Sequence, residues 1–462
     1  MSQYVIFTFI SIILFYKAPN IMDRSFLIVI ILLVSLSIGL HFYKEKKTGI
    51  STMKKIYLRH SVFFIIFFSI VFFQYDIDYI LGFVDTDNIQ IWIDTRVVCR
   101  SLALSCASLN ATLAGYWFYR FNYAKRLADT KLNYSTDMKS LLIILCFSLL
   151  LLYIVVVDKN FLDGGYAQQE SGEAFTIIVM LQAVFLCIYA VYAYEYKQKN
   201  FNKPFISFFK YPLILLIAYM GVILISGRRT EAIRMFSMLF VVYLYCRGVN
   251  ANYKQVILVG ILGMLLFSSV SLLRASRADN LSQAISVQSD ESSILPFTRE
   301  LASSVNTLHV AVDYFPELVD YTNGLTFFPR FLLLIPGMDR LYLTYFEEDR
   351  YKGGSGAIIT ELNLGSNANY GMGSSIVADT YIAFGPILSN IFFFLLGIYM
   401  SYLEAGTFMC RKSPYFLIMS FGVYSQIPYA CRGIMSSLFL SCSYAVLLYF
   451  FIAKFQAILN HR

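Results

Sequence analysis

Two adjacent arginines have the chemistry to bind an anion. Arg228 and Arg229 lie between two apolar stretches that are each long enough to cross a membrane. An unpaired arginine inside a bilayer costs at least about 2.5 to 3.5 kcal/mol, so a doubled pair needs a partner. The free N–H groups of the helix that starts here favour an anionic ligand as well. The alternative is that Arg228 reaches lipid phosphate while Glu231 and Arg234 pair along the helix.

Three further residues have side chains that accept protons. Glu300 and His309 lie in a segment with a helical apolar pattern, and Asp379 follows two glycine clusters. Carboxylates and imidazoles are the usual general bases, so these residues are candidates for deprotonating a hydroxyl group. Each of them, taken singly, is more often structural. His309 lies at the edge of the apolar stripe, where packed histidines are common.

More arginines accompany these candidates. Arg299 precedes Glu300, and Arg274 and Arg277 open the polar stretch 274–296. We take all three as further candidates for binding the same anion, although an arginine such as Arg299 is more often simply solvated.

The sequence predicts no metal site and no cofactor. All eight cysteines lie within or beside apolar segments, so neither a zinc site nor a disulfide framework in the long loop is indicated. The pairs Asp76/Asp78 and Asp85/Asp87 resemble DxD metal sites on an external loop. Short acidic pairs are common wherever topology excludes basic residues, so we do not assign them to a metal.

The elements that position these residues are membrane-spanning helices. The chain is 58% hydrophobic and only 14% charged, against roughly 25% charged in soluble domains. The apolar residues gather in blocks of about 20, the length that crosses a hydrocarbon core. We therefore predict an all-α integral membrane protein with spans at 4–16, 25–42, 61–75, 98–118, 140–157, 174–194, 211–226, 232–246, 255–273, 382–403, 414–430 and 434–453.

Basic and acidic residues alternate between the loops. Lys and Arg concentrate at 43–60, 120–126, 197–210 and 411–412, whereas 76–94 and 158–173 are acidic. The positive-inside rule places the basic loops and both termini in the cytoplasm. The formal charge of +8 then reflects topology and contact with membrane lipid, and no nucleic-acid partner is needed to explain it.

A loop of about 100 residues, 274–373, divides the chain into a bundle at 1–273, a large external loop at 274–381 and a second bundle at 382–462. A loop of this length is usually functional. Residues 297–315 follow the pattern of an amphipathic helix. Residues 325–338 are apolar but too short to span, which suits a re-entrant or interfacial segment. The glycine clusters 353–356 and 371–373 are flexible tips or backbone nests for a pyrophosphate.

The combined pattern from about residue 214 to 404 resembles the Wzy-type O-antigen polymerases. The matching pieces, in order, are 226–230, Arg299 with Glu300, 323–327, 371–375, 378–381 and 384–385. In many members of that family a Glu stands at the position of Asp379.

The resemblance implies an inverting, metal-independent glycosyltransferase of the bacterial inner membrane whose active site faces the periplasm. Donor and acceptor would be glycans on undecaprenyl diphosphate, with a flippase and a chain-length regulator as candidate partners. Arginines would stabilise the leaving diphosphate, and Glu300 or Asp379 would deprotonate the acceptor hydroxyl. The alternatives are an O-antigen ligase and, less favoured because it needs no such loop, a flippase for the lipid-linked repeat unit.

Overall fold

A computed structural model describes residues 1–47, 59–88, 91–122, 138–156, 172–198, 204–225, 229–247, 293, 295, 298–335, 338, 354–368, 371–409 and 414–460. Within these ranges the regular structure is helical and contains no strand. The all-α prediction is therefore confirmed for the described residues.

The long helices coincide with every predicted span that falls in the described ranges, and only the span at 255–273 lies outside them. By length and composition, six helices of the described residues could cross a membrane, and the number of crossings beyond these six stays a prediction. The long helices are α1 (Ser2–Lys17), α2 (Arg24–Lys47), α3 (His60–Ile80), α4 (Val98–Asn122), α5 (Lys139–Val156), α7 (Gly172–Gln198), α9 (Lys210–Ile225), α10 (Arg229–Arg247), α19 (Ile376–Met409), α20 (Pro414–Cys431) and α21 (Ser437–Asn460).

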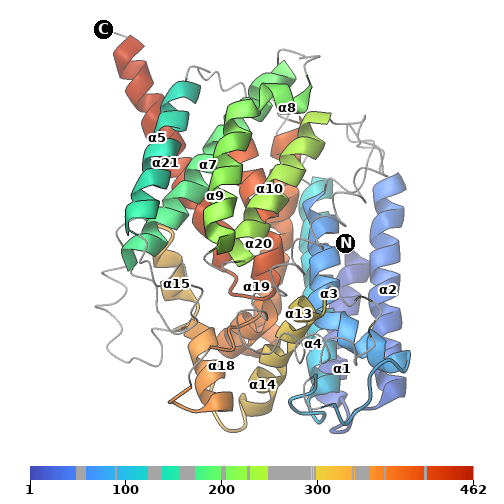
Figure 1. Ribbon diagram of the computed structural model, residues 1–462. Coiled ribbons are helices and arrows are strands. Elements are labelled where there is room, and N and C mark those ends of the chain that lie inside the picture. The colour runs from blue at the N-terminus through green and yellow to red at the C-terminus, as the bar shows by residue number, and fades with distance from the viewer. Residues whose placement is uncertain are drawn as a thin grey trace.

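Shorter helices gather at one end of the bundle. Figure 1 shows α13, α14, α15 and α18 together at the bottom of the view, whereas the C-terminus lies at the top. We call this the loop end of the bundle. The short elements at this end are α13 (Arg299–Ala302), the 3-10 helix η5 (Ser303–Val305), α14 (Asn306–Tyr314), α15 (Phe328–Leu332) and α18 (Gly354–Leu364). A further short helix, α8 (Phe205–Phe208), lies at the opposite end in Figure 1.

Helix α4 is rich in Ala and Ser and is buried along nearly its whole length. A Cβ atom added to Gly115 would lie 1.8 Å from the backbone oxygen of Phe394, and one added to Gly397 would lie 1.9 Å from that of Thr112. Small residues let membrane helices approach this closely. Helix α4 therefore contacts other helices and little lipid, which explains its modest hydropathy.

We expect Gly397→Ala to lower the stability of the protein, because its methyl group requires α4 and α19 to separate. Overpacking of this kind typically costs about 1–3 kcal/mol. Gly39→Ala in α2 is the matched control, since a Cβ atom there meets nothing within 4 Å and Ala favours a helix. Thermal unfolding midpoints of the purified variants in detergent measure the difference. Equal midpoints would contradict the close contact of these two helices.

Helix α19 is broken near its start. Gly385 has φ 72° and ψ −177° and is followed by Pro386, so residues 376–384 form a separate half-helix. The carbonyl oxygens of Ile382 and Ala383 accept hydrogen bonds from the backbone N–H groups of Thr322 and Gly324. Backbone groups freed by such a break need partners. The loop at 322–324 thus holds the half-helix that carries Asp379.

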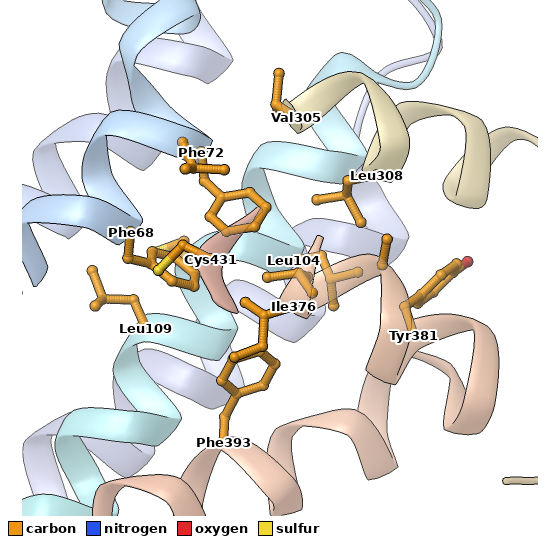
Figure 2. Packing of buried hydrophobic residues seen from close by; sticks show 14 of the residues in the cluster. Phe68, Phe72, Leu104, Leu109, Val305, Leu308, Ile376, Tyr381, Phe393 and Cys431 are labelled. Carbon is orange, nitrogen blue, oxygen red and sulfur yellow. The ribbon is translucent and has the colours of Figure 1, made fainter. Parts of the chain in front are cut away.

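The predicted amphipathic helix at 297–315 forms α13, η5 and α14. Its apolar stripe faces the bundle, because Val305, Leu308, Val312 and Phe315 are buried. Figure 2 shows Val305 and Leu308 in one apolar cluster with bundle residues from α3, α4, α19 and α20, namely Phe68, Phe72, Leu104, Leu109, Ile376, Tyr381, Phe393 and Cys431.

The apolar segment that follows presents side chains to the surface. Leu325, Phe328 and Ile335 are exposed around α15. Exposed apolar side chains beside a membrane bundle suit an interfacial segment that touches lipid. Re-entry into the membrane stays a prediction.

Candidate active site

Asp379 lies at the centre of a hydrogen-bonded group at the loop end. The residue is only 2% exposed. Its Oδ1 accepts a hydrogen bond from Ser355 Oγ at 2.6 Å, and its Oδ2 accepts one from the backbone N–H of Met435 at 3.0 Å. A carboxylate has about four acceptor positions, so positions remain for a further donor. Asp379 therefore joins α18, α19 and the turn between α20 and α21, and it can still accept a proton.

A second serine extends this group. Ser374 Oγ lies 3.0 Å from Ser355 Oγ. A hydroxyl group has one proton, so when Ser355 donates to Asp379, its contact with Ser374 requires Ser374 to be the donor. The three side chains then form a chain of hydroxyl groups that ends at the buried carboxylate, and such a chain can conduct a proton.

Arg330 brings positive charge to the same place. A Cβ atom on Gly354 would lie 2.9 Å from both Nε and Nη2 of Arg330, so the guanidinium lies directly against the backbone at the start of α18. Its charge is close enough to act on Asp379. Sequence reasoning missed Arg330, although it lies in the interfacial segment three residues after the 323–327 motif.

The glycine clusters allow this close packing. Gly354 has φ 66°, a backbone conformation that favours glycine. A Cβ atom on Gly356 would lie 3.2 Å from the backbone of Gly373. The described glycines of the two clusters therefore pack against each other beside Asp379.

The start of α10 reaches the turn between α20 and α21 from another side. The guanidinium of Arg234 lies 3.8 Å from the centre of the Tyr429 ring, in the last turn of α20. Arg234 Nη1 also lies 3.8 Å from Glu231 Oε1, so the pairing that the alternative interpretation predicts is present. Arg229 is the first residue of α10. The helix start that the sequence marked as an anion site therefore lies at the loop end.

His309 is buried on α14. Its ring stacks on Trp92 with centroids 6.1 Å apart, and burial lowers its pKa to about 4. The imidazole is therefore neutral at pH 7. No described contact joins His309 to Asp379, and the stacking favours the packing role.

The structure describes the other predicted site residues only in part. Arg299 is the first residue of α13, and its backbone oxygen accepts a hydrogen bond from the Tyr75 hydroxyl at 3.1 Å. Glu300 follows it on α13, but its side chain is outside the described part of the structure. Arg228, Arg274 and Arg277 also lie outside the described residues.

The prediction that Asp76 and Asp78 lie on an external loop is wrong. Both are buried on α3, because the helix continues to Ile80. Asp78 Oδ2 accepts a hydrogen bond from Ser293 Oγ at 2.7 Å and so fastens the start of the loop region to the bundle. Among the described residues, no group of three or more His, Cys, Asp and Glu side chains could hold a metal ion.

A second buried polar group lies at the opposite end of α4 and α19. The Tyr116 hydroxyl is 2.9 Å from Glu45 Oε1 and 2.6 Å from Glu404 Oε2. Arg59 pairs with Glu45, and Arg120 Nη1 lies 3.4 Å from Glu404. Twenty-five residues of α19 separate Asp379 from Glu404, which is roughly 35–40 Å of helix. This network joins helices at that end and takes no part in the site around Asp379.

A bundle of apolar helices with a buried acid–base and arginine group at one end defines a multi-pass membrane protein with a candidate catalytic site. Comparison with protein families matches residues 2–462 to O-antigen polysaccharide polymerase Wzy. The chain belongs to this family of polysaccharide polymerases. Comparisons with curated proteins and with solved structures found no match.

Proposed function

We propose that the chain joins oligosaccharide repeat units carried on undecaprenyl diphosphate, at the periplasmic face of the bacterial inner membrane. The donor is a growing glycan and the acceptor is a single repeat unit, each on its own lipid. The transfer inverts the anomeric centre and needs neither a metal nor a cofactor. A flippase that supplies the units and a chain-length regulator are the proposed partners.

The position of Asp379 carries this proposal. The carboxylate is buried at the loop end with acceptor capacity left, and Arg330 lies beside it. Phe328, two residues before Arg330 on α15, is 55% exposed. Phe328, Arg330 and Asp379 thus supply an apolar, a cationic and a proton-accepting group. A lipid-linked glycan has the complementary parts in the same order, namely an apolar tail, an anionic diphosphate and sugars that carry hydroxyl groups.

The proposed reaction uses these groups as base and anion stabiliser. The acceptor oxygen attacks the anomeric carbon of the donor, and the bond from that carbon to the diphosphate oxygen breaks. The hydroxyl proton moves to Asp379, directly or through Ser374 and Ser355. The diphosphate leaves with the bonding electron pair, and Arg330 stabilises its charge.

The remaining candidates keep their proposed roles. Arg228 and Arg229 extend the diphosphate site from the start of α10, and Arg274, Arg277 and Arg299 bind the same anion from the large loop. Glu300 is the second candidate base. His309 is proposed to support α14 by packing, with a catalytic role only if its removal stops the transfer.

A deletion strain tests the function, because polymerase, ligase and flippase fail differently. We expect the strain to attach one repeat unit to its lipid A core, since flipping and ligation continue when only elongation stops. Gel electrophoresis of the lipopolysaccharide resolves these forms. Bare core with repeat units on the outer leaflet would indicate a ligase instead, and bare core with units retained on the inner leaflet would indicate a flippase.

A further inference from the structure

We propose that Gln74 on α3 is a positioning residue for the transfer reaction, because it holds the start of α13 and thereby places Arg299 and Glu300. The inference rests on the proposed function, in which Arg299 binds the diphosphate and Glu300 is the second candidate base. Gln74 is only 6% exposed, and it acts through these two residues.

Gln74 binds the residues before α13 with both polar atoms of its amide. Its Nε2 donates to the backbone oxygen of Leu295 at 3.0 Å and to Ser293 Oγ at 3.2 Å. Its Oε1 accepts a hydrogen bond from Thr298 Oγ1 at 2.7 Å. A carbonyl oxygen can only accept, so the amide nitrogen must face Leu295 and the amide oxygen must face Thr298. Both donors of the amide and its oxygen are therefore used by one short segment.

The partners of Gln74 explain the residue type at this position. Glutamate has the same length, but it would place a carboxylate oxygen against the carbonyl oxygen of Leu295. Methionine has the same length and no donor, and asparagine carries its amide one methylene group closer to the backbone. A buried amide is costly unless it is hydrogen-bonded. The segment before α13 supplies the bonds that make a glutamine favourable here.

Two neighbours of Gln74 on α3 hold the same segment. Ser293 Oγ donates its single proton to Asp78 Oδ2 at 2.7 Å, so it can also accept from Gln74. The Tyr75 hydroxyl donates to the backbone oxygen of Arg299 at 3.1 Å. All three α3 residues are buried. Hydrogen bonds from one end of α3 therefore reach as far as the first residue of α13.

These bonds supply information that apolar packing does not. The buried stripe of η5 and α14 selects the face that meets the bundle, but hydrophobic contact has no preferred direction. Hydrogen bonds restrict both distance and angle, so the bonds from α3 define where the first turn of α13 lies. That turn carries Arg299 and Glu300. A displacement of a reacting group by about 1 Å can cost roughly a hundredfold in rate.

Gln74→Met tests the positioning role, because it keeps the length of the side chain and removes both polar atoms. Gln182→Met is the matched control. Gln182 is also a buried glutamine, and its Oε1 accepts a hydrogen bond from Ser441 at 2.8 Å, but it joins α7 to α21. Elongation of the host's lipid-linked repeat unit is measured in membranes at several concentrations. The maximal rate is then divided by the amount of inserted protein.

We expect Gln74→Met to lower the maximal rate per inserted protein roughly ten- to a hundredfold, while Gln182→Met keeps the wild-type rate. A residue that only stabilises the fold would lower the amount of inserted protein and leave the rate of each molecule unchanged. Thr298→Val removes the hydroxyl that binds the amide and should lower the rate about three- to tenfold, the effect of one hydrogen bond. Thr298→Ser keeps the hydroxyl and should retain the wild-type rate.

The double variant shows whether the two residues act through their shared contact. Gln74→Met combined with Thr298→Val should be about as slow as Gln74→Met alone, because the contact is already lost. Losses that multiply would show independent effects and overturn the proposal. If Gln74→Met yields no inserted protein, the comparison of Thr298→Val with Thr298→Ser decides, and equal rates for these two would overturn it.

Two further outcomes separate this inference from the proposed function. Wild-type membranes that elongate the repeat unit, together with an unchanged rate per inserted protein in Gln74→Met, would exclude the positioning role alone. An equal loss of rate in Gln182→Met would exclude it as well, since any buried glutamine would then have the same effect. Wild-type membranes that do not elongate the repeat unit would contradict the proposed function and this inference with it.

Discussion

Asp379→Asn is expected to reduce polymer formation by about 10²- to 10⁴-fold, the usual contribution of a general base, while leaving the amount of inserted protein unchanged. The amide can keep both contacts, with the direction of the hydrogen bond to Ser355 reversed. Its oxygen can accept from the Met435 N–H group, and its Nδ2 can donate to Ser355 Oγ, which also serves as an acceptor. Only the capacity to take a proton is lost. Lipopolysaccharide gels and immunoblots of a tagged protein measure the two quantities.

Two companion variants separate catalysis from packing. Asp379→Ala leaves the Met435 N–H group without its partner and should lower stability by about 1–3 kcal/mol. Asp379→Glu keeps the carboxylate and should retain more polymer than Asp379→Asn. Normal polymer from Asp379→Asn would exclude Asp379 as the base and move that role to Glu300, whose change to Gln should then stop elongation at one repeat unit.

The helices could be predicted because the membrane imposes a simple rule. Each lipid-exposed crossing needs a continuous apolar block, so a local pattern is sufficient. The break at Gly385 could not be predicted in the same way. It depends on hydrogen bonds from Thr322 and Gly324, about 60 residues away in the chain. The position of α4 likewise depends on contacts between Gly115, Gly397 and facing backbone that no local pattern contains.

The site was only partly predictable for a similar reason. The residue type and position of Asp379 made it a candidate, but its partners Ser355 and Met435 lie 24 and 56 residues away. His309 was predicted as a catalytic residue from its type, whereas the structure stacks it on Trp92. Arg330 was missed because a single arginine in an interfacial segment is common. Its place beside Gly354 and Asp379 depends on contacts between distant parts of the chain, which no local pattern contains.

Arg330→Gln is expected to lower polymer formation by roughly ten- to a hundredfold without loss of inserted protein. A charge-assisted hydrogen bond to a diphosphate is worth about 1.5–3 kcal/mol, which corresponds to this range. Arg330→Lys keeps the charge but loses the planar guanidinium, so it should retain intermediate activity. The double change of Arg228 and Arg229 to Ala should cause a loss of at least the same size if these residues bind the same diphosphate.

Arg96→Gln is the matched control for Arg330→Gln. Arg96 is 71% exposed and pairs with Asp94 at 2.6 Å, so its removal should leave polymer formation unchanged. In wild-type membranes, undecaprenyl diphosphate should compete with the donor, and the concentration that halves the rate should rise in Arg330→Gln because the shared diphosphate contact is weaker. If Arg330→Gln changes neither the inhibitory concentration of undecaprenyl diphosphate nor polymer formation, Arg330 is excluded from the diphosphate site. An unchanged value with reduced polymer would assign Arg330 to charge that develops only in the transition state, since such a contact changes rate without changing ground-state binding.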